Sequence, residues 1–112
     1  MLIISKKQLA HFGNISLNKF IEKALDSLRQ NFDLQYVDNA ELEKFVNNRI
    51  NIAEKFNIIN QRPTLDFIIL SYSRKENGNI ENDEKFKKIL NDNTLTDGKK
   101  IDLIESIIVF ED

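Results

Sequence analysis

The chain contains no cysteine and no tryptophan, and its 112 residues include only one proline, one histidine and three glycines. Without cysteine it can form no disulfide, no thiol nucleophile and no cysteine-ligated zinc site. Three isolated glycines provide no glycine-rich loop of the kind that cradles phosphate groups. A hydrophobic core must therefore hold the fold together, and eight phenylalanines with many isoleucines and leucines supply its side chains.

The chain also has no surplus of positive charge and no long hydrophobic run. Its formal net charge is −2, with basic and acidic residues interspersed, which argues against nucleic-acid binding through phosphate neutralisation. No apolar stretch approaches the roughly 20 residues that span a bilayer. The N-terminal residues also lack the order of a secretory signal. These features predict a cytoplasmic protein without membrane insertion.

What the sequence does contain is a series of amphipathic helical patterns. Apolar residues recur at helical spacing from Ser5 to Phe32, and Ser5 with Gln8 has the spacing of a capping box. A second helix is expected over residues 39–56, begun by Asp38 and stopped by Asn57, which tolerates the left-handed conformation.

The middle of the chain is apolar in nearly all directions around a helix, which is typical of a central, buried segment. Pro63 suits the first position of that helix, because its missing N–H has no helical partner there. Residues 65–72 are also good strand formers, so a strand is the alternative for that segment, as it is for residues 107–110.

A polar loop over residues 76–82 follows this segment and leads to a short helix at about residues 83–90. A second polar loop, over residues 91–98, leads to a last helix that begins near Thr96 or Asp97. No repeat or linker indicates a second domain. We therefore predict an all-α fold: one domain over residues 1–112, a compact orthogonal bundle of about five helices with a long amphipathic first helix.

The sequence predicts no catalytic, cofactor-binding or metal site. His11 lies away from the apolar stripe of its helix and is expected to be solvated. Residues 93–98 resemble the start of a calcium loop, but Leu95 and Ile104 stand where oxygen ligands are required. The acidic residues Glu81, Asp83 and Glu84 are expected to favour the start of the following helix. The protein is thus expected not to be an enzyme and to need no cofactor.

Six residues are candidates for contact with a protein partner, and two of them are charged. Arg49 lies on the apolar face of the second helix, where its charged end either reaches solvent at the edge or makes a partly buried ion pair or a partner contact. Asp66, in the first turn of the central helix, either opposes the helix dipole or makes a partly buried ion pair or a partner contact. The remaining candidates are apolar groups left over once each helix buries one stripe, namely Tyr72, Leu103, Val109 and Phe110.

The layout of the whole chain resembles a family of small helical proteins encoded beside the spike and effector genes of bacterial type VI secretion systems. The residues that carry the resemblance are Ile4-Ser5-Lys6-Lys7-Gln8-Leu9, Phe20, Leu28-Arg29-Gln30-Asn31-Phe32, Ile50, Ala53-Glu54-Lys55-Phe56-Asn57-Ile58, Phe67-Ile68-Ile69-Leu70, Gly78, Phe86 and Ile89-Leu90-Asn91-Asp92. The resemblance implies an accessory protein of an antibacterial secretion apparatus that works through protein–protein contact.

The leading hypothesis is accordingly an adaptor or chaperone that helps to load a toxic effector onto the secretion spike. The alternative is an immunity protein that neutralises such a toxin, although the net charge is only mildly acidic. The sequence is also compatible with a homo-oligomer. In each case the expected partner is another protein, which the sequence does not identify.

Overall fold

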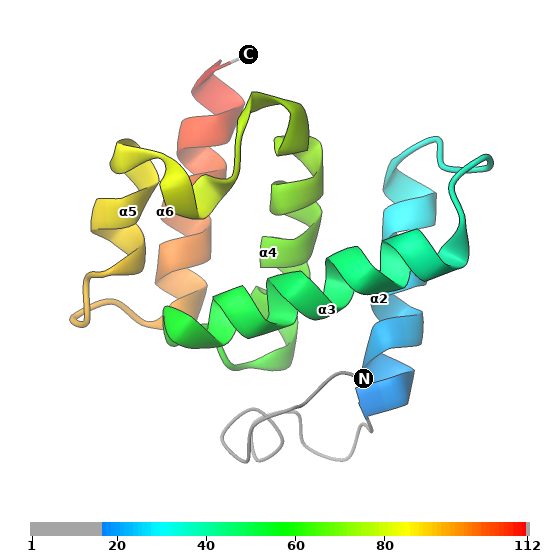
Figure 1. The fold of residues 1–112 in the computed structure, drawn as a ribbon. Coiled ribbons are helices and arrows are strands. Elements are labelled where there is room, and N and C mark those ends of the chain that lie inside the picture. The colour runs from blue at the N-terminus through cyan, green and yellow to red at the C-terminus, as the bar shows by residue number, and fades with distance from the viewer. Residues whose placement is uncertain (1–16, 112) are drawn as a thin grey trace.

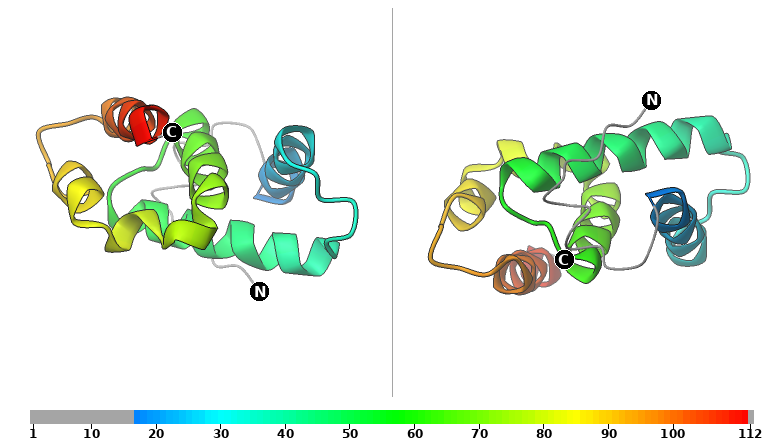
Figure 2. Two further views of the ribbon diagram at one scale, coloured as in Figure 1. Left: turned by 90° about the horizontal axis from the view of Figure 1, so that it is seen from above. Right: turned by 90° about the horizontal axis from the view of Figure 1, so that it is seen from below.

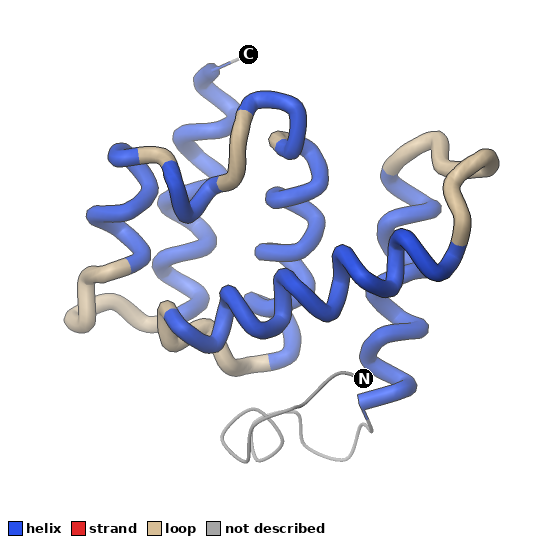
Figure 3. Tube along the Cα trace, in the orientation of Figure 1, coloured by secondary structure: helices blue, strands red, loops and turns tan. Residues whose placement is uncertain are grey.

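The computed structural model describes residues 17–111 of the chain. The described part consists of the helices α2 (Leu17–Asn31), α3 (Asn39–Lys55), α4 (Gln61–Ser73), α5 (Glu84–Leu90) and α6 (Asp97–Glu111), with the 3₁₀ turns η1 (Lys75–Asn77) and η2 (Ile80–Asn82) between α4 and α5. No strand occurs within it (Figure 3). The predicted all-α fold is confirmed, and residues 65–72 and 107–110 are helical rather than extended.

The expected long first helix is only partly described. Its second half is present as α2. The predicted start at Ser5, with its capping partner Gln8, and the expected exposure of His11 lie outside the described residues.

The helices are arranged around α3 and α4. In Figure 1, α3 runs across the molecule, while α2, α4 and α6 run roughly upright. Seen from above, α4 lies between α2 on one side and the pair α5 and α6 on the other (Figure 2). The contacts agree, because α4 packs against α2, α3 and α6. Among residues 17–111, no helix is both long enough and apolar enough to cross a membrane.

Most helix boundaries follow the capping signals. The Asp38 carboxylate accepts a hydrogen bond from the backbone N–H of Ala40 and begins α3. Asp83 does the same for α5, as its place before that helix predicts. At the end of α3, Asn57 adopts a positive φ of 65°, so the predicted left-handed stop is confirmed.

One predicted boundary is wrong by two residues: α4 begins at Gln61, and Pro63 is its third residue rather than its first. The N–H of Thr64 is the first to bond back, to the carbonyl of Asn60. The early N–H groups of a helix have no partner inside it, so proline is tolerated anywhere in this turn. The loop predicted over residues 76–82 contains two short 3₁₀ turns, which are joined through Gly78 at a φ of 97°.

The buried side chains form two hydrophobic clusters that meet at α3 and α4. The first joins α2 to one side of α3 and α4, and its members include Phe20, Leu28, Val46 and Ile68. The second joins α5 and α6 to the other side and consists of Ala53, Ile58, Phe67, Ile80, Phe86, Leu90, Ile101 and Ile104. Because α4 contributes to both, its apolar circumference is covered on two sides, as the sequence predicted.

A buried lysine connects three helices at the second cluster. Lys100, on α6, is 1% exposed. Its Nζ donates hydrogen bonds to the carbonyl of Phe56 at the end of α3, at 2.7 Å, and to that of Leu90 at the end of α5, at 2.8 Å. Both carbonyls belong to the last turn of a helix, where the intrahelical donors run out and the dipole favours a cation.

Asp97, one turn earlier, joins α6 to the loop before α4. One of its carboxylate oxygens accepts the backbone N–H groups of Ile59, at 3.2 Å, and Asn60, at 3.0 Å, and also the side-chain amide of Asn60, at 2.8 Å. Thr96 caps the same helix start by accepting the N–H of Lys99. The first turn of α6 is therefore a junction between the elements of the second cluster.

We predict that Lys100→Met lowers the free energy of unfolding by about 2 kcal/mol, because two helix-terminal carbonyls lose their donor inside the protein. Urea denaturation monitored by circular dichroism measures this change. The exposed neighbour provides the control, since Lys99→Met should change stability by less than about 0.5 kcal/mol. Equal stability of the two variants would show that the buried ammonium does not hold the junction.

Candidate protein-binding surface

Arg49 is part of a buried ion pair. It is 3% exposed, and its guanidinium binds both carboxylate oxygens of Glu81 on η2, at 2.7 and 2.9 Å. The ring centroids of Phe45 and Phe67 lie 5.9 and 6.0 Å from the guanidinium carbon. The sequence left three roles open for Arg49: a charged end in solvent, a partly buried ion pair or a partner contact. The structure shows the ion pair. Its further role in binding a partner stays a prediction.

Glu81 was expected to serve the next helix start and instead ties η2 to α3. Burial alone would raise the pKa of its carboxyl group, but the hydrogen bonds from Arg49 and the positive charge nearby outweigh burial and lower that pKa. The carboxylate is therefore ionised at neutral pH. Asp66 is in contact with Arg62, one turn away on α4, as an exposed ion pair at 3.2 Å.

Tyr72 also lies in the interior, in the first hydrophobic cluster. It is 8% exposed, and its ring centroid lies 4.9 Å from that of Phe32 and 5.1 Å from that of Phe45, the latter in an edge-to-face arrangement. Lys75 covers the outer side of the ring at 4.4 Å. The small hollow beside it measures about 180 Å³, which is less than the roughly 300 Å³ at which ligand sites begin. Whether Tyr72 contacts a partner stays a prediction.

The other three candidates lie on α6. Leu103 is half-buried, whereas Val109 is 63% exposed and Phe110 is 89% exposed. Among the described residues, the only other large hydrophobic side chain with comparable exposure is Tyr36, in the loop between α2 and α3. Val109 and Phe110 are consecutive residues near the end of α6 and line the same surface hollow, so a single partner surface can cover both.

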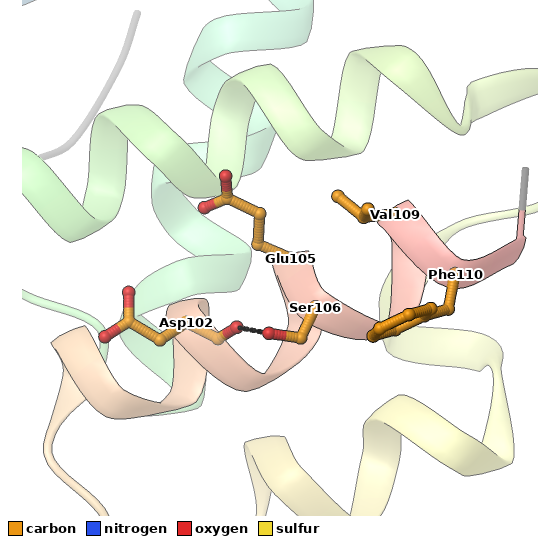
Figure 4. A pocket seen from close by; sticks show the side chains of 5 residues that line it. All are labelled: Asp102, Glu105, Ser106, Val109 and Phe110. Atoms are coloured by element: carbon orange, nitrogen blue, oxygen red, sulfur yellow. Dashed lines mark hydrogen bonds between the residues drawn. The ribbon is translucent and has the colours of Figure 1, made fainter.

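These two residues form part of a continuous strip, which we call the α6 outer face: Asp102, Glu105, Ser106, Val109 and Phe110. The strip surrounds a shallow surface hollow of about 360 Å³. Figure 4 shows that all five side chains come from α6, with the Phe110 ring extending back toward Ser106. Lys100, Ile101 and Ile104 occupy the opposite side of the helix and bury it against the core. The outer face is thus directed to solvent.

Two of the ionisable groups whose pKa the structure perturbs, Asp97 and Lys100, serve the packing. Burial opposes the ionisation of Asp97, but hydrogen bonds from Asn60, Ile59 and Gly98 lower its pKa overall. Burial also lowers the pKa of Lys100, whose ammonium donates to two backbone carbonyls. Within residues 17–111, no three His, Asp or Glu side chains converge in a way that could hold a metal ion.

Three residues that join elements of the fold, Glu81, Asp97 and Lys100, were not predicted from the sequence to do so. A signal existed for Lys100, which occupies the position four residues before Ile104 on the buried stripe of α6. An ionisable residue on such a stripe indicates a buried polar contact. No comparable signal marks Glu81, because it stands 32 residues from Arg49 and the two meet only through the tertiary fold.

We predict that Arg49→Met lowers the free energy of unfolding by about 3 kcal/mol, because the Glu81 carboxylate then stays poorly solvated without its partner. The double variant Arg49→Met with Glu81→Leu should regain most of that loss, since it removes both charges. A double-mutant cycle in urea measures the coupling between the two residues. Additive effects of the two substitutions would contradict a direct ion pair.

Comparison of the chain with known protein families, with curated proteins and with solved structures found no match. Of the described surface, the α6 outer face is the part where exposed apolar side chains are adjacent on one regular element.

Proposed function

We propose that this protein is a non-catalytic binding module that acts in the cytoplasm by docking another protein on the α6 outer face. The observation that carries the proposal is the exposure of Val109 and Phe110, at 63% and 89%, side by side on a well-anchored helix. Burying a large apolar side chain contributes about 1.5–3 kcal/mol, so covering this pair is a substantial gain for a complex. Aromatic residues are also enriched among the residues that dominate binding energies.

The anchoring of α6 supports this role. Its first turn is held by the Asp97 and Lys100 hydrogen bonds to three other segments. A surface that is ordered before binding loses little conformational entropy when the partner arrives. The start of the helix that carries the outer face is therefore fixed before a partner binds.

The resemblance to small proteins encoded beside type VI secretion genes supports a finer proposal. In that setting the protein is an adaptor or chaperone that delivers a toxic effector to the secretion spike. The α6 outer face would contact the effector or the spike, and the rest of the molecule would serve as its scaffold.

We predict that deleting the gene in its bacterium lowers export of the neighbouring effector and that the wild-type chain restores it. The variant Val109→Ser with Phe110→Ser should fail to restore export, because the apolar docking surface is lost. Tyr36→Ser is the matched control, since it removes an equally exposed aromatic from the α2–α3 loop. Secretion assays with immunodetection of the effector give the measurement.

The same strains separate the adaptor from the immunity protein. An immunity protein would protect cells that are exposed to the toxin and leave export unchanged, and this result would replace the adaptor proposal. If the double serine variant fully restored both effector export and any protection against the toxin, the α6 outer face would be excluded as the docking surface.

A further inference from the structure

The geometry of the α6 outer face points to the chemistry of its partner. We propose that this face binds an amphipathic helix of another protein whose apolar side chain is flanked by lysine or arginine. This inference rests on the proposed function and makes it specific, because it names the kind of segment that the binding module receives.

The spacing of the strip favours a helix as the occupant. Asp102, Glu105, Ser106 and Val109 stand at positions i, i+3, i+4 and i+7, which is the four-residue arrangement that accepts a knob from a facing helix. The small Ser106 side chain lies between larger neighbours at the hollow. Its hydroxyl donates to the carbonyl of Asp102 at 3.0 Å, so an apolar knob can enter without leaving this hydroxyl unpaired.

The charge of the strip favours a basic partner. Asp102 and Glu105 are exposed, and neither carboxylate has an ion-pair partner within residues 17–111. Residues 101–112 contain no lysine or arginine. The negative end of the α6 dipole lies next to the apolar pair and adds to the negative potential.

Three of the other four described helices differ from α6 at this end, whereas α4, like α6, has no basic residue in its last turn. Basic side chains stand in the last turn of α2, α3 and α5, at Arg29, Lys55 and Lys87 with Lys88. The last turn of α6 has none. A partner helix with cations beside its apolar knob would supply the charge that this helix end lacks in the described chain.

The same charges disfavour other occupants. In a two-fold pair of α6 helices, the Asp102 and Glu105 carboxylates of both copies would border one interface without a cation from residues 101–112 between them. An anionic membrane or a nucleic acid would also be repelled by this face. A helical protein segment with basic flanks is the occupant that satisfies both the shape and the charge.

The test uses the full chain and two synthetic helical peptides of about three heptads, long enough to form a helix on docking. Both carry one leucine stripe; one has lysine and arginine beside the stripe, and the other has glutamate at the same positions. Fluorescence anisotropy of the labelled peptides measures binding. We expect the basic peptide to bind at least about tenfold more tightly than the acidic one.

Two variants locate the binding. The double substitution Asp102→Lys with Glu105→Lys should weaken binding of the basic peptide about tenfold, because two favourable charge contacts become repulsive. The control is Asp26→Lys with Glu43→Lys, which makes the same change in net charge at exposed positions of α2 and α3 and should leave binding within about twofold. The double substitution Val109→Ser with Phe110→Ser should weaken binding of the basic peptide at least about tenfold, because the apolar contacts are lost.

Several results would overturn the inference: no binding of the basic peptide, equal binding of both peptides, or equal losses from the two charge-reversal variants. A dimer of the wild-type chain that Phe110→Ser dissociates in sedimentation experiments would assign the face to a second copy instead. These failures are distinct from failure of the proposed function. Effector export could require Val109 and Phe110 but be unaffected by the charge reversal at Asp102 and Glu105. This result would support the proposed binding module and contradict the inference that its partner is basic.

Discussion

The structure depends on the burial of α4 from two sides. Its buried residues include Leu65, Phe67, Ile68 and Tyr72, which point in different directions around the helix. A helix with apolar side chains around its circumference must be surrounded to be stable in water. The helices α2 and α3 cover one side, and α5 and α6 complete the other, so two hydrophobic clusters share one central element.

This arrangement explains why the polar contacts lie where they do. The second cluster is assembled from short or late elements, and each of these is tied to the α3–α4 unit by a charged side chain. Arg49 holds η2 through Glu81, Lys100 joins α6 to the ends of α3 and α5, and Asp97 binds the loop before α4. Buried charges of this kind are tolerated because each has hydrogen-bond partners. They also orient α6, which leaves its outer face in solvent.

The sequence predicted the elements far better than the contacts between them. Apolar periodicity and capping residues such as Asp38, Asn57 and Asp83 are local signals, and they located the described helices within about two residues. Of the candidate site residues, Val109 and Phe110 lie exposed and adjacent, whereas Arg49 and Tyr72 are buried. That difference depends on which helices cover which faces. Periodicity identifies a buried stripe, but it does not show that η2 brings Glu81 to Arg49.

Native-state hydrogen exchange tests the central role of α4 most directly. If α4 is enclosed by both clusters, its backbone amides should exchange only through global unfolding and be the slowest in the chain, while amides at the end of α6 exchange much faster. Exchange from residues 65–72 that is as fast as that from residues 107–110 would contradict the account, because α4 could then open without separating the two clusters.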